Sequence, residues 1–353
     1  MRIQIHTYLN NPSGSICNVA ANWIRVLSRH HEVKVNDFSR DCRFEDIRPL
    51  LGEFDLHPRE VPVSIYIAFP SYIKTTGNPA ARHAQSIGVF VCETKLNQLE
   101  HNYISSFKKI VVPSQYCKNW FASAVPESKI QIIHHGIDPV FQPISMQGEA
   151  GFTYLFIFNT SPSGGSEIRK NVRVLLGAFD IVKKKIPEAR LILKTTPNTE
   201  LDLEKEKRRH PGLETISLHI PKEELAKLYN RCNVYVNPTS AEGFGMTALE
   251  AMACGTPVVS PVHTGMTEFL SNSNCVQVPC ELGKENFSYS TNHGPIYKIK
   301  KIDLANAMIS AYNEYNQLVV NATGHSEYIR ERFSWENVLQ GLTQWLTILN
   351  RKP

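Results

Sequence analysis

The first half of the chain alternates between short apolar runs and longer amphipathic segments. Its opening predicts a strand over residues 2–7, a loop over 8–15 (YLNNPSGS) and a helix over 16–29. In that helix apolar side chains recur every three or four residues, which places them on one face. Further apolar runs, each short enough for a strand, follow at 31–35, 63–69, 87–92, 109–112 and 130–133. This alternation predicts a parallel sheet that is covered by helices on both faces.

A change of composition separates this half from the next. Residues 139–151 (PVFQPISMQGEAG) combine prolines, glycines and polar side chains without periodicity, and we interpret them as a linker. After them the alternation restarts, with strands expected at 152–158, 190–194, 215–218, 234–237 and 257–260 and helices at 172–184, 222–230 and 247–253. The pattern predicts a first domain over residues 1–145 and a second doubly wound domain over 152–330.

The C-terminal part carries one more amphipathic helix. Residues 334–349 place tryptophans, leucines and a valine on a single helical stripe, so this helix must pack against another part of the protein. We expect residues 331–353 to form a closing helix. Residues 270–299 show no clear period, and we expect an irregular surface segment there.

Composition and charge place the chain among globular proteins. Of its 353 residues 42% are hydrophobic and 20% are charged, which does not indicate a disordered or fibrous protein. The net charge of +5 is spread along the chain; it allows contact with phosphates or an anionic membrane surface but does not suggest nucleic-acid binding. Eight cysteines without a C-x-x-C pair indicate reduced thiols, and no apolar run approaches the ~18 residues of a membrane span, so a cytoplasmic protein is expected. Metal-ligand spacings such as H-E-x-x-H do not occur, so no metal is expected.

The stretch 241–259 (AEGFGMTALEAMACGTPVV) carries the most distinctive chemistry. Glu242 and Glu250 flank a glycine turn that opens the expected helix, and Gly243 and Gly245 let a ligand approach the backbone closely. The first turn of a helix has N–H groups without intrahelical partners, and these attract an anion such as a phosphate. A carboxylate just inside the helix can accept hydrogen bonds from sugar hydroxyls. These features suggest a nucleotide-sugar site.

Two other interpretations fit the same residues. Thr247 and Glu250 match the S/T-x-x-E capping box, in which the glutamate satisfies N–H groups of its own helix and binds no ligand, and spacing alone favours neither reading. Residues 243–248 (GFGMTA) also match the dinucleotide fingerprint G-x-G-x-x-A. Against that fingerprint, the glycines come several residues after the strand, and the strand at 257–260 ends without the acidic residue that the ribose of NAD requires.

A wider resemblance favours the nucleotide-sugar reading. Residues 220–260 resemble the donor-binding half of retaining GT-B glycosyltransferases, in particular glycosyltransferase family 4 (glycosyl transferases group 1), whose Glu-x7-Glu motif is matched by Glu242 and Glu250. Further segments resemble the family in the expected order: 109–121 (KIVVPSQYCKNWF), 135–143 (HGIDPVFQP), 169–179 (RKNVRVLLGAF) and 332–335 (RFSW). The resemblance implies an α/β protein of GT-B architecture, with two Rossmann-like doubly wound parallel-sheet domains facing a central cleft and a last helix that returns to the first domain.

The resemblance also implies roles for single residues. Glu250 would hold the ribose hydroxyls of the donor nucleotide, and Glu242 would face the transferred sugar. Lys170 looks like the family's diphosphate lysine, whose charge stabilises the leaving group as preorganised cations do in other enzymes. Glu93 matches the position near the reacting carbon, so Glu93, Lys170 and Glu242 are the implied catalytic residues. The other implied donor contacts are Gly14, Arg169, Gly243, Phe244, Gly245, Met246 and Thr247.

Two of these assignments have visible weaknesses. Where the family carries an arginine several residues before the lysine, this chain has residues 160–166 (TSPSGGS), and Arg169 adjoins the lysine instead. We therefore expect Arg169 or a flexible loop to share diphosphate binding. Gly14 fits an ordinary strand-to-helix turn with a serine N-cap equally well.

The implied activity is that of a hexosyl or pentosyl transferase (EC 2.4). It would move a sugar from a UDP- or GDP-sugar to a hydroxyl of a glycan, lipid-linked or small-molecule acceptor, with retention of configuration and without a metal or other cofactor. Peripheral contact with a membrane surface is compatible with this reading. Two alternatives stay open: a nucleotide-sugar epimerase on the same fold, and a catalytically degenerate partner subunit that binds nucleotide sugars.

Overall fold

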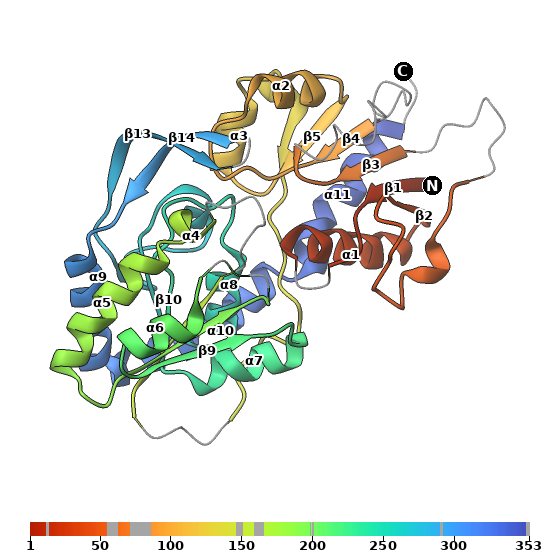
Figure 1. The fold of residues 1–353 in the computed structure, drawn as a ribbon. Helices are drawn as coiled ribbons and strands as arrows, with labels where there is room; N and C mark the ends of the chain where they lie inside the picture. The colour runs from red at the N-terminus through yellow and green to blue at the C-terminus, as the bar shows by residue number, and fades with distance from the viewer. Residues whose placement is uncertain are drawn as a thin grey trace. The chain divides into compact units, whose positions relative to one another are not determined.

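A computed structural model describes residues 1–11, 14–54, 63–70, 86–145, 151–158, 166–197, 199, 201–289 and 292–350. The chain divides into two compact units (Figure 1). The first consists of Met1–Gly136 and Phe333–Pro353, and the second of Ile137–Arg332. Among the described helices, none combines the length and the apolar composition that a bilayer crossing requires.

The first unit is built on a parallel sheet of six strands in the order β2-β1-β3-β4-β5-β6. The strands are β1 (Arg2–Thr7), β2 (Glu32–Asp37), β3 (Val63–Ile67), β4 (Ser86–Val89), β5 (Lys109–Val112) and β6 (Ile130–Ile132). The helical segments are α1 (Ser15–Ser28), η1 (Arg48–Leu50), α2 (Gln98–Ser105), α3 (Gln115–Phe121) and η4 (Glu127–Lys129). Every residue of β3 is buried, as expected for a central strand with helices on both faces. The strands expected from the apolar runs are confirmed to within a few residues.

Helix α11 (Trp335–Asn350) also belongs to the first unit, where it packs on α1. Leu339, Leu342 and Leu346, three leucines of the apolar stripe that the sequence places on this helix, are at most 1% exposed. Gly136 makes room for the aromatic ring of Trp335, because a Cβ atom at that position would lie 2.5 Å from the ring.

Residues 137–145, interpreted from sequence as the end of the first domain and part of a linker, belong to the second unit. The backbone N–H of Ile144 donates to Asn230 Oδ1 at 2.7 Å, and Asn230 Nδ2 donates to the Gln142 carbonyl at 3.0 Å. Phe141 is buried with its ring edge-on to Tyr229. These contacts join the segment to α7 (Lys222–Arg231). The sequence gives no sign of them, because its prolines and glycines suggest only a linker. Residues 146–150 of the expected linker lie outside the described residues.

The second unit has its own parallel sheet of six strands in the order β12-β11-β10-β7-β8-β9. The strands are β7 (Thr153–Ile157), β8 (Arg190–Thr195), β9 (Leu213–Ser217), β10 (Val234–Val236), β11 (Val258–Ser260) and β12 (Val276–Gln277). The helical segments besides α7 are α4 (Ser166–Arg169), α5 (Val172–Lys185), α6 (Leu203–Arg209), α8 (Met246–Ala253), η5 (Thr264–Glu268), α9 (Lys301–Asn313) and α10 (Tyr315–Arg332). Counted from β7 as the first strand, the order is that of the doubly wound dinucleotide-binding sheet, 3-2-1-4-5-6.

The core of the second unit explains this layering. Apolar residues of α5 and α9 form one buried cluster with side chains from the strands, including Phe156, Leu191 and Leu193. The helices α5 and α9 lie side by side (Figure 1), and α8 contacts both α7 and α10. The sequence-predicted strands and helices of this unit are confirmed with small shifts of their ends.

The expectation of an irregular segment over residues 270–299 is wrong. Besides β12, this region holds β13 (Glu281–Tyr289) and β14 (Asn292–Lys298), which pair antiparallel with each other as a separate two-stranded sheet. The pairing satisfies backbone hydrogen bonds within the hairpin, so these strands need no regular apolar alternation to form. For that reason the pattern of the side chains conceals them.

We predict that Leu342→Ala lowers the free energy of unfolding by about 2–5 kcal/mol, because it removes a fully buried side chain where α11 packs on the rest of the first unit. Chemical denaturation followed by circular dichroism measures the change. The neighbouring Gly341→Ala is the matched control: a Cβ at that position meets nothing within 4 Å, so it should raise helix stability by roughly 0.5–1 kcal/mol. Equal free energies of unfolding for Leu342→Ala and wild type would show that the packing of α11 does not stabilise the first unit.

Candidate functional site

The sheet of the second unit has one topological switch point, between β7 and β10. Strand β7 pairs with β8 on one side and with β10 on the other, so the chain leaves these two strands in opposite directions. In open α/β sheets ligands bind outside the carboxyl ends of the strands at such a point. Arg169 and Lys170 follow β7, and Glu242 follows β10, so the loops that carry them flank the switch point.

Three predicted site residues meet there in a buried charge cluster. Glu242 Oε1 lies 2.5 Å from Lys170 Nζ and 3.1 Å from Arg169 Nη1, and it accepts a hydrogen bond of 2.9 Å from Thr239 Oγ1. Arg169 Nη1 also donates to the carbonyl of Ala241 at 2.7 Å. The side chains of Glu242, Lys170 and Arg169 are all at most 11% exposed. Two cations around one carboxylate leave an excess of positive charge, which suits an anionic ligand.

Burial and the two cations act in opposite directions on Glu242. Burial by itself would raise the pKa of this carboxyl, but Lys170 and Arg169 outweigh it and lower the pKa to about 2. The carboxylate is therefore ionised at every physiological pH. All the contacts described above engage Oε1, and Glu242 Oε2 has no hydrogen bond within the part of the chain that the structure describes.

The two loops at the switch point are held together by their backbones. The N–H of Ser240 donates to the Arg169 carbonyl at 2.8 Å, and Asn171 Nδ2 donates to the Pro238 carbonyl at 2.8 Å. Asn171 adopts a left-handed conformation with φ 53°, which asparagine tolerates better than most residues. This connection fixes Lys170 and Glu242 in register with each other.

The predicted glycine turn opens α8 as expected. Gly245 is the N-cap residue and has φ 100°, a conformation that favours glycine. A Cβ at Gly245 would lie 2.7 Å from Met266 Cγ, and one at Gly265 would lie 2.1 Å from the Gly243 carbonyl oxygen. Phe244 is buried against Phe269, so its possible ligand contact is through the backbone.

The structure excludes the capping box. Helix α8 begins at Met246 and its N-cap makes no side-chain hydrogen bond, so Thr247 is the second helical residue and Glu250 lies more than one turn inside. Instead Glu250 Oε2 accepts a hydrogen bond of 2.8 Å from Tyr229 Oη of α7. Burial raises the pKa of Glu250 to about 7, although the Tyr229 hydroxyl and the Lys222 ammonium act to lower it. Glu250 therefore gains or loses its proton near neutral pH.

Gly14 and Glu93 belong to the first unit. Gly14, and not a serine, is the N-cap residue of α1. A Cβ at Gly14 would lie 3.1 Å from the Asn11 side chain. Glu93 is half-buried beyond the end of β4, and its carbonyl accepts a hydrogen bond of 2.8 Å from Tyr116 Oη. Both residues follow strands of one parallel sheet at its carboxyl edge. Residues 12–13 of the glycine loop and 160–165 of the segment TSPSGGS lie outside the described residues.

Several supporting residues escaped the sequence analysis. The Thr264 hydroxyl accepts a hydrogen bond of 3.1 Å from the Glu242 N–H, and the Gly265 N–H donates to the Glu242 carbonyl at 2.9 Å. The ring of His263 stacks on Tyr297 with centroids 4.2 Å apart, and its Nε2 lies 3.0 Å from the Thr239 carbonyl. His263, Thr264 and Gly265 lie just after β11, so the carboxyl end of that central strand was the signal that would have pointed to them, whereas Tyr297 lies in β14.

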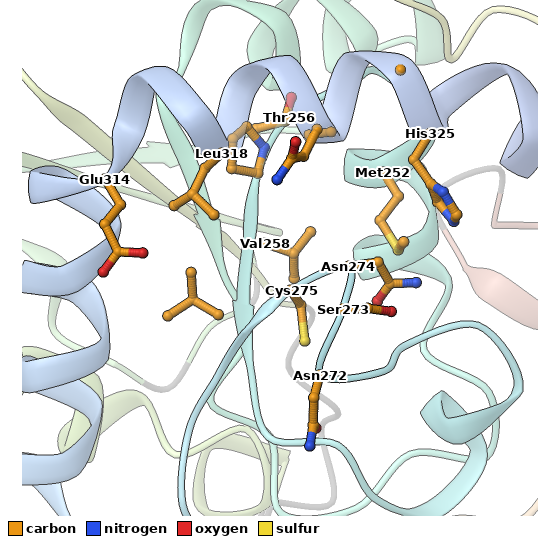
Figure 2. Close-up of a pocket in the computed structure, with 15 residues that line it drawn as sticks. Met252, Thr256, Val258, Asn272, Ser273, Asn274, Cys275, Glu314, Leu318 and His325 are labelled. Atoms are coloured by element: carbon orange, nitrogen blue, oxygen red, sulfur yellow. The ribbon is translucent and has the colours of Figure 1, made fainter.

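A cavity of about 500 Å³ lies away from this site, at the amino ends of β11 and β12. Figure 2 shows Leu318 and His325 of α10 facing Asn274 and Cys275 across it. None of the predicted site residues lines the cavity. Over the described ranges, no three His, Cys, Asp or Glu side chains are grouped so that they could hold a metal ion.

Solved structures resemble the whole chain. The structure of Anabaena Alr3699/HepE in complex with UDP-glucose superposes with a TM-score of 0.73 over 98% of this chain and 99% of that one, at 16% identity. The sucrose-phosphate synthase of Thermosynechococcus elongatus superposes with a TM-score of 0.67 over 99% of both chains, at 15% identity. The chain has the GT-B fold. Each of the two units of this GT-B protein contains one of the six-stranded parallel sheets.

The match to a known sequence family lies within the second unit. Residues 163–279 match the family model described as glycosyl transferases group 1. Mannosylfructose-phosphate synthase of Agrobacterium fabrum is 34% identical over 112 residues, which is 29% of this chain and 25% of that protein. O-antigen chain mannosyltransferase B of Escherichia coli is 33% identical over 123 residues, or 33% of this chain and 32% of that protein. The similarity thus spans a quarter to a third of these curated relatives.

We predict that Gly265→Ala displaces the glycine turn, because its new methyl group would collide with the Gly243 carbonyl. The free energy of unfolding should fall by roughly 1–3 kcal/mol, as is typical of overpacking. Gly324→Ala in α10, where a Cβ meets nothing within 4 Å, should instead be neutral or slightly stabilising. Urea denaturation of both variants checks this; similar stabilities would show that the close approach is not a real constraint.

Proposed function

We propose that the protein is a glycosyltransferase that moves a sugar from a nucleotide-diphosphate sugar to an acceptor hydroxyl. The carrying observation is the buried cluster at the switch point, where Lys170 and Arg169 surround the single carboxylate of Glu242. Its excess positive charge adjoins the glycine-opened start of α8, whose first N–H groups also favour an anion. A diphosphate fits both features.

The other donor contacts follow from this placement. The backbone N–H groups of residues 243–247 would bind the diphosphate, with Lys170 and Arg169 neutralising its charge. Glu242 would accept a hydrogen bond from the transferred sugar through Oε2, while Oε1 stays with the cations. Glu250, on the same helix, would accept hydrogen bonds from the ribose hydroxyls. The roles of Gly14 and Glu93 rest on the family resemblance alone.

The chemistry requires little from side chains acting as acids or bases. The bond between the anomeric carbon and the diphosphate oxygen breaks, the acceptor oxygen bonds to that carbon, and the acceptor proton passes to the departing phosphate oxygen. Lys170 and Arg169 would stabilise the negative charge that develops on the leaving group, so the reaction needs no metal in this proposal. Retention of configuration follows from the family resemblance.

The comparisons support particular classes of donor nucleotide and of acceptor. Solved structures of the same fold contain UDP-glucose, UDP, or UDP with a sugar, which supports a UDP-sugar donor, with a GDP-sugar as the second choice. The names of three relatives refer to mannosylfructose phosphate, an O-antigen chain and sucrose phosphate, which supports a glycan or small-molecule acceptor. A lipid-linked acceptor rests on the family resemblance alone. We propose that the reaction takes place in the cytoplasm.

We predict that Lys170→Met lowers the kcat/KM of sugar transfer by about 10²–10³-fold, as the loss of one preorganised charge contact typically does. Arg169 still neutralises Glu242 in this variant, so folding should be retained. Transfer is measured with a panel of radiolabelled sugar nucleotides and acceptors. Lys227→Met, on the exposed face of α7, is the control and should behave as wild type.

Incubation of donor without acceptor separates this proposal from an epimerase. A transferase leaves the donor sugar unchanged or slowly hydrolysed, whereas conversion to an isomeric sugar nucleotide would establish the epimerase. If the folded wild-type protein binds nucleotides but transfers no sugar to any acceptor of the panel, the role of a degenerate partner subunit is favoured.

We predict that the affinity for the sugar nucleotide rises about tenfold between pH 6 and pH 8, because ribose hydroxyls donate to the ionised form of Glu250, whose pKa is about 7. In Glu250→Gln the affinity should be weaker at pH 8 and nearly independent of pH. Isothermal titration calorimetry of both proteins measures this difference.

Stability gives the matched control for the same substitution. A carboxyl whose pKa is raised on folding stabilises the protein most below its ordinary value of 4.5, and this contribution is lost as the pH rises to about 7. Glu250→Gln should therefore be at least as stable as wild type at pH 8. A loss of stability with unchanged affinity would contradict a ligand role for Glu250.

A further inference from the structure

A buried lysine at the carboxyl end of β8 has no part in the site as described so far. Lys194 is the penultimate residue of β8 and is only 5% exposed. Leu191 and Leu193 point into the cluster that includes α5 and α9. Because side chains alternate along a strand, Lys194 points to the other face of the sheet. Glu250 of α8 is the charged group that interacts with it there.

The ammonium group of Lys194 makes no hydrogen bond or ion pair with the residues that the structure describes. Burial lowers its pKa, and the charge of Glu250 only partly opposes that shift. An ammonium carries three N–H donors, and those of Lys194 are open to acceptors from a ligand or from water. The neighbouring cations differ in this respect, since Lys222 is paired with Asp138, and Lys170 with Glu242.

The position of Lys194 along the sheet indicates which part of a ligand it meets. Strand β8 lies next to β7 on the side away from β10, so Lys194 is one strand beyond the Arg169–Lys170 loop. A nucleotide with its diphosphate at that loop and its ribose at Glu250 extends its base away from the transferred sugar. The base is then the part of the ligand that can provide acceptors for Lys194.

We propose that Lys194 binds the nucleobase of the donor and favours a base that presents a carbonyl oxygen, uracil or guanine, over adenine. This inference rests on the proposed function. An ammonium only donates hydrogen bonds, and the O4 of uracil and the O6 of guanine accept them, whereas adenine carries an amino donor at the corresponding position. Lys194 would therefore donate a hydrogen bond to uracil or guanine, whereas with adenine its ammonium would face another hydrogen-bond donor.

Calorimetry with UDP, GDP, ADP and inorganic pyrophosphate tests the proposal on the full-length protein. Wild type should bind UDP or GDP more tightly than ADP. In Lys194→Met the affinity for the preferred nucleotide should fall by about 10- to 100-fold, the usual effect of losing a hydrogen bond from a charged group. The affinities for ADP and pyrophosphate should change by less than about twofold, and Lys227→Met should match wild type throughout.

Lys170→Met distinguishes failure of this inference from failure of the proposed function. That variant should lose affinity for pyrophosphate and for all three nucleotides alike. If it does, while Lys194→Met binds every ligand as wild type does, or weakens the three nucleotides by one common factor, the inference about the base is wrong and the donor site stands. A preference of wild type for ADP also overturns it.

A folded wild type that binds neither pyrophosphate nor any nucleotide overturns the proposed function itself. Lys194→Gln guards against misfolding of the methionine variant, because its amide keeps two N–H donors without the charge. It should retain part of the preference for carbonyl bases, and a variant that weakens the binding of ADP as much as that of UDP or GDP would contradict the assignment.

Discussion

The site of this protein depends on one buried interaction, the contact of Glu242 with Lys170 and Arg169 at the switch point of the second sheet. A buried carboxylate is unfavourable unless it is paired, and here the pairing joins residues that are 72 positions apart in the chain. The contact is possible because β7 and β10 are neighbours in the sheet although four described helices, α4 to α7, and two strands separate them in sequence. The sheet order thus creates the cluster, and the cluster in turn holds the two loops in one conformation.

Two acids near the start of α8, Glu242 before the helix and Glu250 within it, have contrasting environments. Glu242 sits between cations and keeps its charge, with its pKa at about 2. Glu250 is buried beside the Tyr229 hydroxyl, and burial raises its pKa to about 7 although Lys222 and Lys194 act to lower it. Divergent environments for two nearby carboxyls are a recurrent property of functional sites, because each is then suited to a different partner. A purely structural helix start would not require this difference.

Much of this arrangement could be predicted from the sequence, and the omissions have physical causes. The apolar runs located the strands of both sheets except the two-residue β12, since a buried parallel strand needs apolar residues on both faces. The Glu-x7-Glu spacing located both acids, and the glycines located the turn. The direct contact of Lys170 with Glu242 could not be predicted, because it depends on strand order. Neither could the hairpin of β13 and β14, whose strands are held by backbone pairing, nor Lys194, whose burial breaks the pattern of its strand.

Tyr297 joins the hairpin to the loop of Glu242. The N–H of Tyr297 donates to the Ser240 carbonyl at 3.0 Å, and its ring stacks on His263 beside the switch point. The two strands pair only with each other and share no ladder with the large sheet. Sequence variation farther along the hairpin therefore leaves the hydrogen-bond ladder of that sheet untouched. Such a hairpin can therefore vary in length and side chains while the charged cluster of Glu242, Lys170 and Arg169 is unchanged.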